Sequence, residues 1–322
     1  MPIDHAVSHR PACMKAARVH QFGAIDAIHV EEIQRPEPAA GQVLVRVHAA
    51  GVGPWDAWVR AGRSKLGQPL PLTLGSDISG TVETVAEGVD DLFAGDAVYG
   101  ATNALFIGAY AEFAVAEATM LAHKPRQLSH VEAASVPVVA CTAWQLVHTY
   151  GRIHRAERVL VHGAAGNVGA YAVQFAKLAG AHVIGTCRHA DVAFLENLGV
   201  DHVVDVDAER FEDVAKDVDA VLDTVGGDTL ERSLDVVRRG GVVASSVSAP
   251  NPARSASKGI RSEFFYVSVD TTTLTRIAGL LDAGNIKPNV GEVLPLSQAR
   301  LAHEMLEGKS HKRGKIVLAI PS

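Results

Sequence analysis

The sequence predicts an α/β protein of two domains: a first domain of short β-strands, then a doubly wound parallel sheet covered by helices. Three observations carry this prediction. The chain has 322 residues, more than one hydrophobic core usually organises. Up to about Val138, short alternating segments are punctuated by Gly and Pro. From about residue 158, strand-like and helix-like segments alternate, and a glycine turn joins the first pair.

Composition narrows the functional classes. Hydrophobic residues make up 48% of the chain and charged residues 20%, which is typical of a folded, soluble protein. The formal net charge of −6 argues against a nucleic-acid surface. No apolar run reaches the roughly 18 residues that a membrane span needs. The 3 cysteines form no CxxC pair, so we expect no structural zinc and a reducing, cytoplasmic compartment.

The N-terminal half begins with an arm and continues with strands. Residues 1–13 contain no apolar h-region, so we expect a flexible arm rather than a signal peptide. Residues 42–52 and 78–89 alternate apolar and polar side chains, with glycine punctuation in the second segment. Short strands separated by frequent Gly and Pro turns are typical of a barrel or a sandwich.

The second half alternates strands and helices. From Ala133, a short helix is interrupted at Pro137 and followed by a longer one. A further strand is expected at 263–269, then an amphipathic helix that ends before Gly284, and a last strand that could return to the first domain. Between these, we expect strands at 158–162, 182–187, 219–223 and 241–246, and helices at 167–179, 191–198, 209–216 and 228–238.

The turn between the first strand and helix of this domain has glycines at three-residue spacing. A tight turn that brings a phosphate close to backbone N–H groups needs residues without a Cβ, and the helix N-terminus adds partial positive charge. The spacing is GxxGxxG rather than GxGxxG, but the flanking elements are those of a dinucleotide site. A packing turn without a ligand is the alternative. The expected cofactor contacts here are Gly163, Ala165, Gly166, Asn167, Val168 and Gly169.

The end of the second strand predicts which cofactor binds. NAD-preferring domains place an acid there to bind the ribose hydroxyls, whereas this strand ends with Thr186, Cys187 and Arg188. Arg188 would attract a 2′-phosphate that an acid would repel, so we predict NADPH, with Thr186 and Arg188 as contacts. A solvated cation is the alternative for Arg188. Asp191 opposes the prediction, although it suits a helix N-terminus better.

Other strand ends should line the same crevice. They contribute Thr224 and Val225, after Asp223, and Val247. Asp223 could equally bind neighbouring backbone. The basic loop 253–262 could approach a phosphate, but we favour a mobile, solvated loop.

Together with the first domain, these motifs resemble the zinc-independent medium-chain dehydrogenase/reductase superfamily, and most of all its quinone oxidoreductase (ζ-crystallin-like) and enone reductase group. The resemblance covers nearly the whole chain after Met14 and includes "AAGVGPWDAWVRAG", "FAGDAVYG", "GAYAEFAV", "CTAWQLV" and "GKIVL". It implies a GroES-like β-barrel domain formed by 14–138 and 285–322. A Rossmann domain of residues 139–284 would be inserted in it, with the active site in the cleft between them. It also implies a homodimer, for which "FFYVSV" offers a strand edge.

The resemblance also bears on metal and reaction. Zinc-dependent relatives have Cys and His ligands where this chain has Gly53 and Ser76, and Glu where it has Asp77, so we expect no metal. Without a Lewis acid, the favoured acceptors are those that hold the charge themselves: a quinone or an α,β-unsaturated carbonyl, reduced by hydride from NADPH. The alternatives are a carbonyl or alcohol dehydrogenase, and a non-catalytic NADPH-binding sensor or crystallin-like protein.

Several residues around the substrate follow from the resemblance. Trp55 is expected to form a flat wall of the cleft, Trp58 less so, and Tyr110 is a candidate proton donor that more often packs. Thr142, Phe265 and Tyr266 match positions beside the nicotinamide.

Four other positions complete the expectations. Relatives carry Asn where this chain has Gly53, so a polar group is missing from the cleft. Asp56 is expected to cap a helix or pair with Arg60. Lys315 should lie near the domain interface or in solvent, and His162 should be buried with its hydrogen bonds satisfied.

Overall fold

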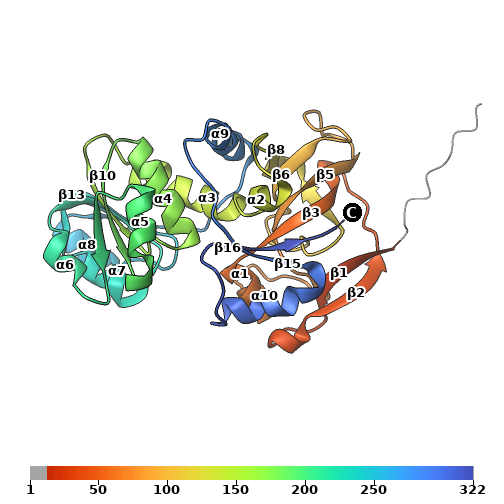
Figure 1. Ribbon diagram of the computed structural model, residues 1–322, viewed down its shortest axis with the longest axis horizontal. Coiled ribbons are helices and arrows are strands. Elements are labelled where there is room, and N and C mark those ends of the chain that lie inside the picture. The colour runs from red at the N-terminus through yellow and green to blue at the C-terminus, as the bar shows by residue number, and fades with distance from the viewer. Residues whose placement is uncertain (1–12, 322) are drawn as a thin grey trace, which may run out of the picture.

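The computed structural model describes residues 13–321. The chain forms two lobes, one with two mainly antiparallel sheets and one with a parallel sheet, and α3 (Pro137–Trp144) lies between the lobes (Figure 1). Most of the arm expected at 1–13 lies outside the described residues. Cys13, its last residue, already belongs to the first strand, which corrects that boundary.

The first lobe is an antiparallel barrel-like domain. Its larger sheet has the order β15-β16-β3-β5-β6-β8, with β7 also paired to β3, and its smaller sheet has the order β2-β1-β4. The last strand of the chain, β16, pairs antiparallel with β3, as the sequence suggested. The strands are β1 (Cys13–Val19), β2 (His29–Gln34), β3 (Gln42–Val52), β4 (Leu72–Thr73), β5 (Asp77–Val85), β6 (Ala97–Ala101), β7 (Phe113–Glu117), β8 (Leu121–His123), β15 (Val290–Pro295) and β16 (Lys315–Ala319).

Helices close the ends of this lobe. Gly53 is the N-cap of α1 (Pro54–Arg60), and Pro54 stands in the first helical turn, where its missing N–H removes no intrahelical hydrogen bond. A capping box of Ser129 and Glu132 begins α2 (His130–Ala134). The amphipathic α10 (Ala299–Leu306) packs its buried face on the barrel core.

The second lobe is a doubly wound parallel sheet with the order β11-β10-β9-β12-β13-β14. The chain starts in the middle at β9, so the strand order reverses between β9 and β12, the place where such sheets bind ligands. Its strands are β9 (Arg158–His162), β10 (His182–Cys187), β11 (His202–Asp205), β12 (Val218–Asp223), β13 (Val237–Ser245) and β14 (Arg261–Phe264). Its helices are α4 (Asn167–Leu178), α5 (Val192–Leu198), α6 (Phe211–Val214), α7 (Gly227–Ser233), α8 (Pro252–Lys258) and α9 (Thr271–Asp282), with a π-helical turn at Gln145–Gly151.

The sequence prediction of this α/β topology is confirmed, but several boundaries are wrong. The helix expected at 228–238 ends at Ser233, because Val237 already pairs with Val218 and begins β13. The helix expected at 209–216 is the short α6. The basic loop expected at 253–262 is instead a helix and a strand: Asn251 caps α8, and Arg254 forms an ion pair with Asp235.

The strand expected at 263–269 is also shorter than predicted. It ends at Phe264: the N–H of Phe265 still donates to Ser245 of β13 at 3.4 Å, but the backbone at Ser268 bonds a side chain instead of a strand. The amide of Gln145 donates to the carbonyl oxygen of Ser268 at 2.6 Å, and Phe265 turns inward to stack on Tyr150 at 4.2 Å between ring centroids. Among the described residues, no helix is long and apolar enough to cross a membrane.

Candidate active site

The glycine turn leaves the N-terminus of α4 open. Gly163 follows β9 at φ +65°, a left-handed conformation that favours a residue without a Cβ. A Cβ on Gly169 would lie 2.2 Å from the carbonyl oxygen of Gly163, so only glycine lets the helix pack this closely on the turn. Gly166 occupies the N-cap and has no side chain with which to cap the helix.

As a result, the backbone N–H groups of Asn167, Val168 and Gly169 have no hydrogen-bond partner within residues 13–321. Three such donors at the start of a twelve-residue helix, together with its dipole, form an anion-binding cradle. The residues present therefore fit the phosphates of a dinucleotide.

Two neighbouring strand ends adjoin this turn. A Cβ on Gly163 would lie 2.7 Å from Thr224 Oγ1 and 3.0 Å from Val225 Cγ2, and one on Gly226 would lie 2.8 Å from Val247 Cγ1. Val225 and Val247 are exposed, so they offer an apolar surface next to the cradle. The structure thus brings together the predicted residues of β9, β12 and β13.

Buried polar side chains hold these strand ends in place. Asp223 accepts hydrogen bonds from the backbone N–H of Gly226 at 3.0 Å and from Ser245 Oγ at 2.6 Å, as one of its two predicted roles required. His162 contacts the hydroxyls of Thr186 at 3.2 Å and Ser233 at 2.9 Å. Burial lowers the pKa of His162 to about 4, so it is neutral, as expected of a satisfied core histidine.

Thr186 supports the turn from beneath rather than facing the crevice. Its side chain is buried, and its hydroxyl accepts from the backbone N–H of Gly163 at 3.2 Å. Arg188, two residues later, is exposed, and its guanidinium has no ion pair in the described part of the chain. It is a free cation at the rim of the crevice.

Asp191 does not cap α5 as expected. It stands at the N-cap, but its carboxylate makes no capping hydrogen bond. Instead it binds Arg313, whose Nε donates to Asp191 Oδ1 at 2.6 Å and whose guanidinium also lies 4.8 Å from the ring centroid of Phe194. Arg313 comes from the loop before β16, so this pair ties the barrel to the rim of the crevice. The sequence gives no local signal for a pair that lies so far apart in the chain.

The three residues expected beside the nicotinamide, Thr142, Phe265 and Tyr266, do not face one common surface. Thr142 lies on α3, and its hydroxyl donates to the carbonyl of Val138 within the same helix at 2.7 Å. Phe265 is buried, whereas Tyr266 is 70% exposed. The two rings therefore point to opposite sides of the chain, and Phe265 packs in the core.

The helix α1 separates its two tryptophans. Trp55 is partly buried and packs against the hydrophobic cluster of the Rossmann lobe and α3, so it lies where the two lobes meet. Trp58, three residues later on the same helix, is 55% exposed.

Tyr110 is not placed as a proton donor. It is fully buried, its hydroxyl donates to Asp56 Oδ2 at 2.8 Å, and burial raises its pKa well above the usual range. Asp56 caps α1 as predicted, accepting from the backbone N–H of Gly53 at 2.8 Å. The alternative prediction, an ion pair between Asp56 and Arg60, is wrong, because Arg60 binds Glu307 and the ring of His303 instead.

A buried ion pair joins β16 to β5. Lys315 Nζ lies 3.0 Å from Asp77 Oδ2, and both side chains are buried, which corrects the solvated reading of Lys315. Asp77 Oδ1 accepts from the backbone N–H of Val138, at the start of α3. Burial raises the pKa of Asp77, and the ammonium of Lys315 opposes that rise. Sequence reasoning missed this pair because nothing near either residue predicts burial.

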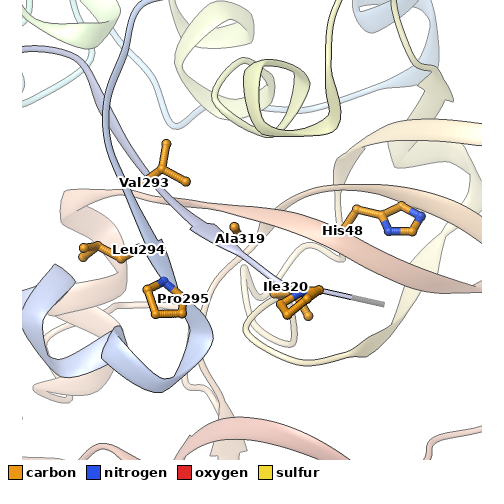
Figure 2. A pocket seen from close by; sticks show the side chains of 7 residues that line it. His48, Val293, Leu294, Pro295, Ala319 and Ile320 are labelled. Atoms are coloured by element: carbon orange, nitrogen blue, oxygen red, sulfur yellow. The ribbon is translucent and has the colours of Figure 1, made fainter.

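A separate hollow lies at the β15–β16 edge of the barrel. It is lined by His48, Val293, Leu294, Pro295, Ala319, Ile320 and Pro321 (Figure 2). All of these belong to the barrel lobe, so this hollow is not the cofactor crevice. Within residues 13–321, no three His, Cys, Asp or Glu side chains form a group that could hold a metal ion.

Two protein families match the chain. The family described as the alcohol dehydrogenase GroES-like domain matches residues 39–126, and the one described as zinc-binding dehydrogenase matches residues 198–318. The chain is similar over its length to the quinone oxidoreductase of Mus musculus, with 31% identity over 95% of this chain and 98% of the relative.

Two other relatives and a solved structure are also similar to the chain over most of its length. A mitochondrial NAD(P)H oxidoreductase, RTN4IP1, of Danio rerio is 31% identical over 87% of this chain and 84% of its own. The 2-methylene-furan-3-one reductase of Solanum lycopersicum is 32% identical over 96% of this chain and 79% of its own. The structure of the quinone oxidoreductase from Coxiella burnetii superposes with a TM-score of 0.89 at 30% identity, covering 96% of this chain and 100% of that chain.

Proposed function

Because the chain belongs to the quinone oxidoreductase and enone reductase group of the medium-chain dehydrogenase/reductase superfamily, we propose that it transfers hydride from NADPH to a quinone or an α,β-unsaturated carbonyl. Membership makes it an NAD(P)H-dependent oxidoreductase. The choice of NADPH and of the acceptor is our proposal. The observation that supports dinucleotide binding is the open cradle of three N–H donors beside two converging strand ends, and the exposed Arg188 supports NADPH.

The chain's own residues would divide the work. The amides of Asn167, Val168 and Gly169 bind the pyrophosphate, and Val225 and Val247 cover the nucleotide with apolar surface. When bound, NADPH supplies a hydride, and a proton from water completes reduction of the acceptor. Alignment of the two π systems and exclusion of water are then the main tasks of the cleft.

Charges at the end of β10 favour NADPH. Arg188 is exposed and unpaired within residues 13–321, and the nearby carboxylate of Asp191 is neutralised by Arg313. Asp205 lies 2.7 Å from His189 Nδ1, a contact that cancels the charge of the carboxylate only when His189 is protonated. Asp207 has no cationic partner in the described chain and weighs against a 2′-phosphate. Among the described residues at this rim, a dianionic phosphate would therefore meet one unpaired cation, Arg188, and two acids, Asp205 and Asp207. The proposal of NADPH depends on Arg188 directly following the strand that contacts the ribose.

The test is consumption of NADPH and of NADH, followed optically with ortho-quinones, para-quinones, short enones and simple aldehydes, for the wild type and Arg188→Ala. We expect turnover with quinones or enones. Loss of a charge-assisted contact should lower kcat/KM for NADPH about tenfold or more and change that for NADH less than about twofold.

Arg239→Ala is the matched control, because Arg239 is exposed near the opposite end of the same sheet. Equal losses with both cofactors in Arg188→Ala would contradict its role. Turnover of simple aldehydes alone would favour a carbonyl or alcohol dehydrogenase, and tight NADPH binding without any turnover would favour the sensor or crystallin-like alternative.

Three further proposals accompany this one. The domain limits are proposed as 13–138 with 285–322, and 139–284, with the first limit moved from 14 to 13 because β1 begins at Cys13. A homodimer is proposed through β14, which is the edge strand of its sheet and is followed by the exposed Tyr266; sedimentation velocity tests it. A cytoplasmic location is proposed from the sequence, and fractionation of cells tests it, since one relative is named as mitochondrial.

A further inference from the structure

The indole of Trp55 occupies the space that a side chain at position 53 would need. A Cβ built on Gly53 would lie 2.3 to 2.4 Å from three atoms of the six-membered ring of Trp55. Those three ring atoms are the nearest atoms to the built Cβ. The backbone of Gly53 is extended, at φ −128° and ψ 159°, which any residue can adopt. The absence of a side chain at this position therefore serves the indole rather than the backbone.

Two further contacts fix the ring. Trp55 Nε1 donates to Ser76 Oγ at 3.0 Å. The ammonium of Lys315 lies 4.2 Å from the ring centroid, a cation–π contact made away from water. Lys315 is itself held by Asp77. The indole of Trp55 is therefore fixed by three contacts: Gly53 at the edge of its six-membered ring, Ser76 at its N–H and Lys315 over one face.

The position of the ring matters as much as its rigidity. Asp77 also bonds the start of α3 through the N–H of Val138, and Trp55 packs on the cluster that includes α3 and Phe265. The indole is thus a fixed surface at the meeting of the two lobes, where part of it remains exposed. Because its N–H is already bonded to Ser76, it offers an acceptor no hydrogen-bond donor, only aromatic surface.

We propose that Trp55 is a specificity-determining residue that selects planar, fully conjugated acceptors, and that Gly53, Ser76 and Lys315 are the residues that position it. This inference rests on the proposed reductase function. A flat ring can stack on the indole in offset geometry, whereas an acceptor with bulky groups out of its plane cannot approach it. The acceptor class it names is therefore the unhindered quinones, ahead of quinones that carry a tert-butyl group.

The test is a double-mutant cycle with NADPH and two acceptors, 1,4-naphthoquinone and a tert-butyl-substituted benzoquinone. In Trp55→Ala, the ratio of kcat/KM for the flat over the bulky acceptor should fall about three- to tenfold. Gly53→Ala should move the ratio in the same direction, because the new Cβ displaces the indole. Adding Gly53→Ala to Trp55→Ala should change nothing further, since the atoms it would strike are gone.

Phe93→Ala is the control: it removes an aromatic ring that is 65% exposed in the turn between β5 and β6, and the ratio should stay within about twofold of the wild type. An equal loss with both acceptors in Trp55→Ala would overturn the proposal. So would an effect of Gly53→Ala that persists in the Trp55→Ala background. Thermal unfolding and NADPH titration of each variant confirm that it folds and binds cofactor.

A second readout separates this inference from the proposed function. The chain has 3 tryptophans, so Trp58→Phe with Trp144→Phe leaves Trp55 as the single emitter. Saturable quenching of its emission by 1,4-naphthoquinone, abolished by Gly53→Ala, is expected even if no acceptor is turned over, in which case the function fails and the inference stands. Quenching that does not saturate, or is unchanged by Gly53→Ala, would overturn the inference itself.

Discussion

The nucleotide crevice and the acceptor wall are built in opposite ways. The crevice is made of backbone: a turn of seven residues supplies its cradle, and glycines supply the room. The wall is made of side chains from three distant segments, Trp55 on α1, Ser76 before β5 and Lys315 on β16. A site made from local backbone should tolerate side-chain changes nearby but no added Cβ, whereas a site made from distant side chains should fail when any partner is removed.

The largest effect is expected at the buried pair behind the wall. Lys315→Met removes the only cation within ion-pair distance of the Asp77 carboxylate in the described chain and leaves a buried charge uncompensated. The free energy of unfolding should fall by about 3 to 5 kcal/mol, measured by urea denaturation. Adding Asp77→Asn should restore part of this loss. A single variant as stable as the wild type would mean that the pair holds nothing together.

This contrast explains how much the sequence could predict. The parallel sheet, its strand ends and the glycine turn follow from patterns within a few residues, and they are correct except at some boundaries. The sequence left two readings open for Tyr110 and for Lys315, because the burial of each depends on segments far away in the chain. "GVGPW" reads as a loop that lacks a polar group, and only the fold reveals that Trp55 fills the space at Gly53.

The second effect tests the backbone side of the comparison. In Gly169→Ala, the new methyl group would lie 2.2 Å from the carbonyl oxygen of Gly163, so turn and helix must separate. NADPH binding should weaken about 10- to 100-fold, as overpacking of this size implies, measured by quenching of protein fluorescence. The control is Gly279→Ala in α9, where a Cβ meets nothing within 4 Å. Unchanged NADPH binding in Gly169→Ala would show that the N–H groups at the start of α4 are not part of the nucleotide site.

A third effect concerns pH and the helix that carries Trp55. Burial raises the pKa of Asp56 to about 7 from an ordinary value of 3.8. Between these values the folded protein holds a proton that the unfolded chain releases, so the raised pKa makes stability fall as pH rises, by up to about 1.4 kcal/mol per pH unit. Asp56→Asn, whose amide oxygen can still accept from Gly53 and Tyr110, should lose this slope.

Two buried histidines change the stability with pH in the opposite direction to Asp56. The quantity to measure is therefore the difference in stability between Asp56→Asn and the wild type at each pH. Burial lowers the pKa of His162 to about 4 and that of His303 to about 3. Both are neutral when folded and take up protons when unfolded below about pH 6.5, so their contribution to stability grows as pH rises to that point. Urea midpoints of Asp56→Asn and wild type from pH 4.5 to about 7 should diverge in favour of the variant at the higher pH. Parallel curves would show that Asp56 titrates normally.

The smallest effect is expected at the ion pair between Asp191 and Arg313, which joins the two lobes. Arg313→Gln would free the carboxylate of Asp191, three residues from Arg188, and return a negative charge to the rim of the crevice. Because this pair is partly exposed, the change should be modest: a fall of about two- to fivefold in the preference for NADPH over NADH, larger at low salt than at high salt. Asp191→Asn should leave the preference unchanged or raise it, and the double variant should behave like Asp191→Asn, because Arg313 then has no charge to cancel. If Arg313→Gln lowers the preference equally in the Asp191→Asn background, the guanidinium acts on the phosphate itself rather than through Asp191. The barrel would then contribute a side chain to the nucleotide site, and the division between a backbone-built crevice and a side-chain-built wall would have to be redrawn at this loop.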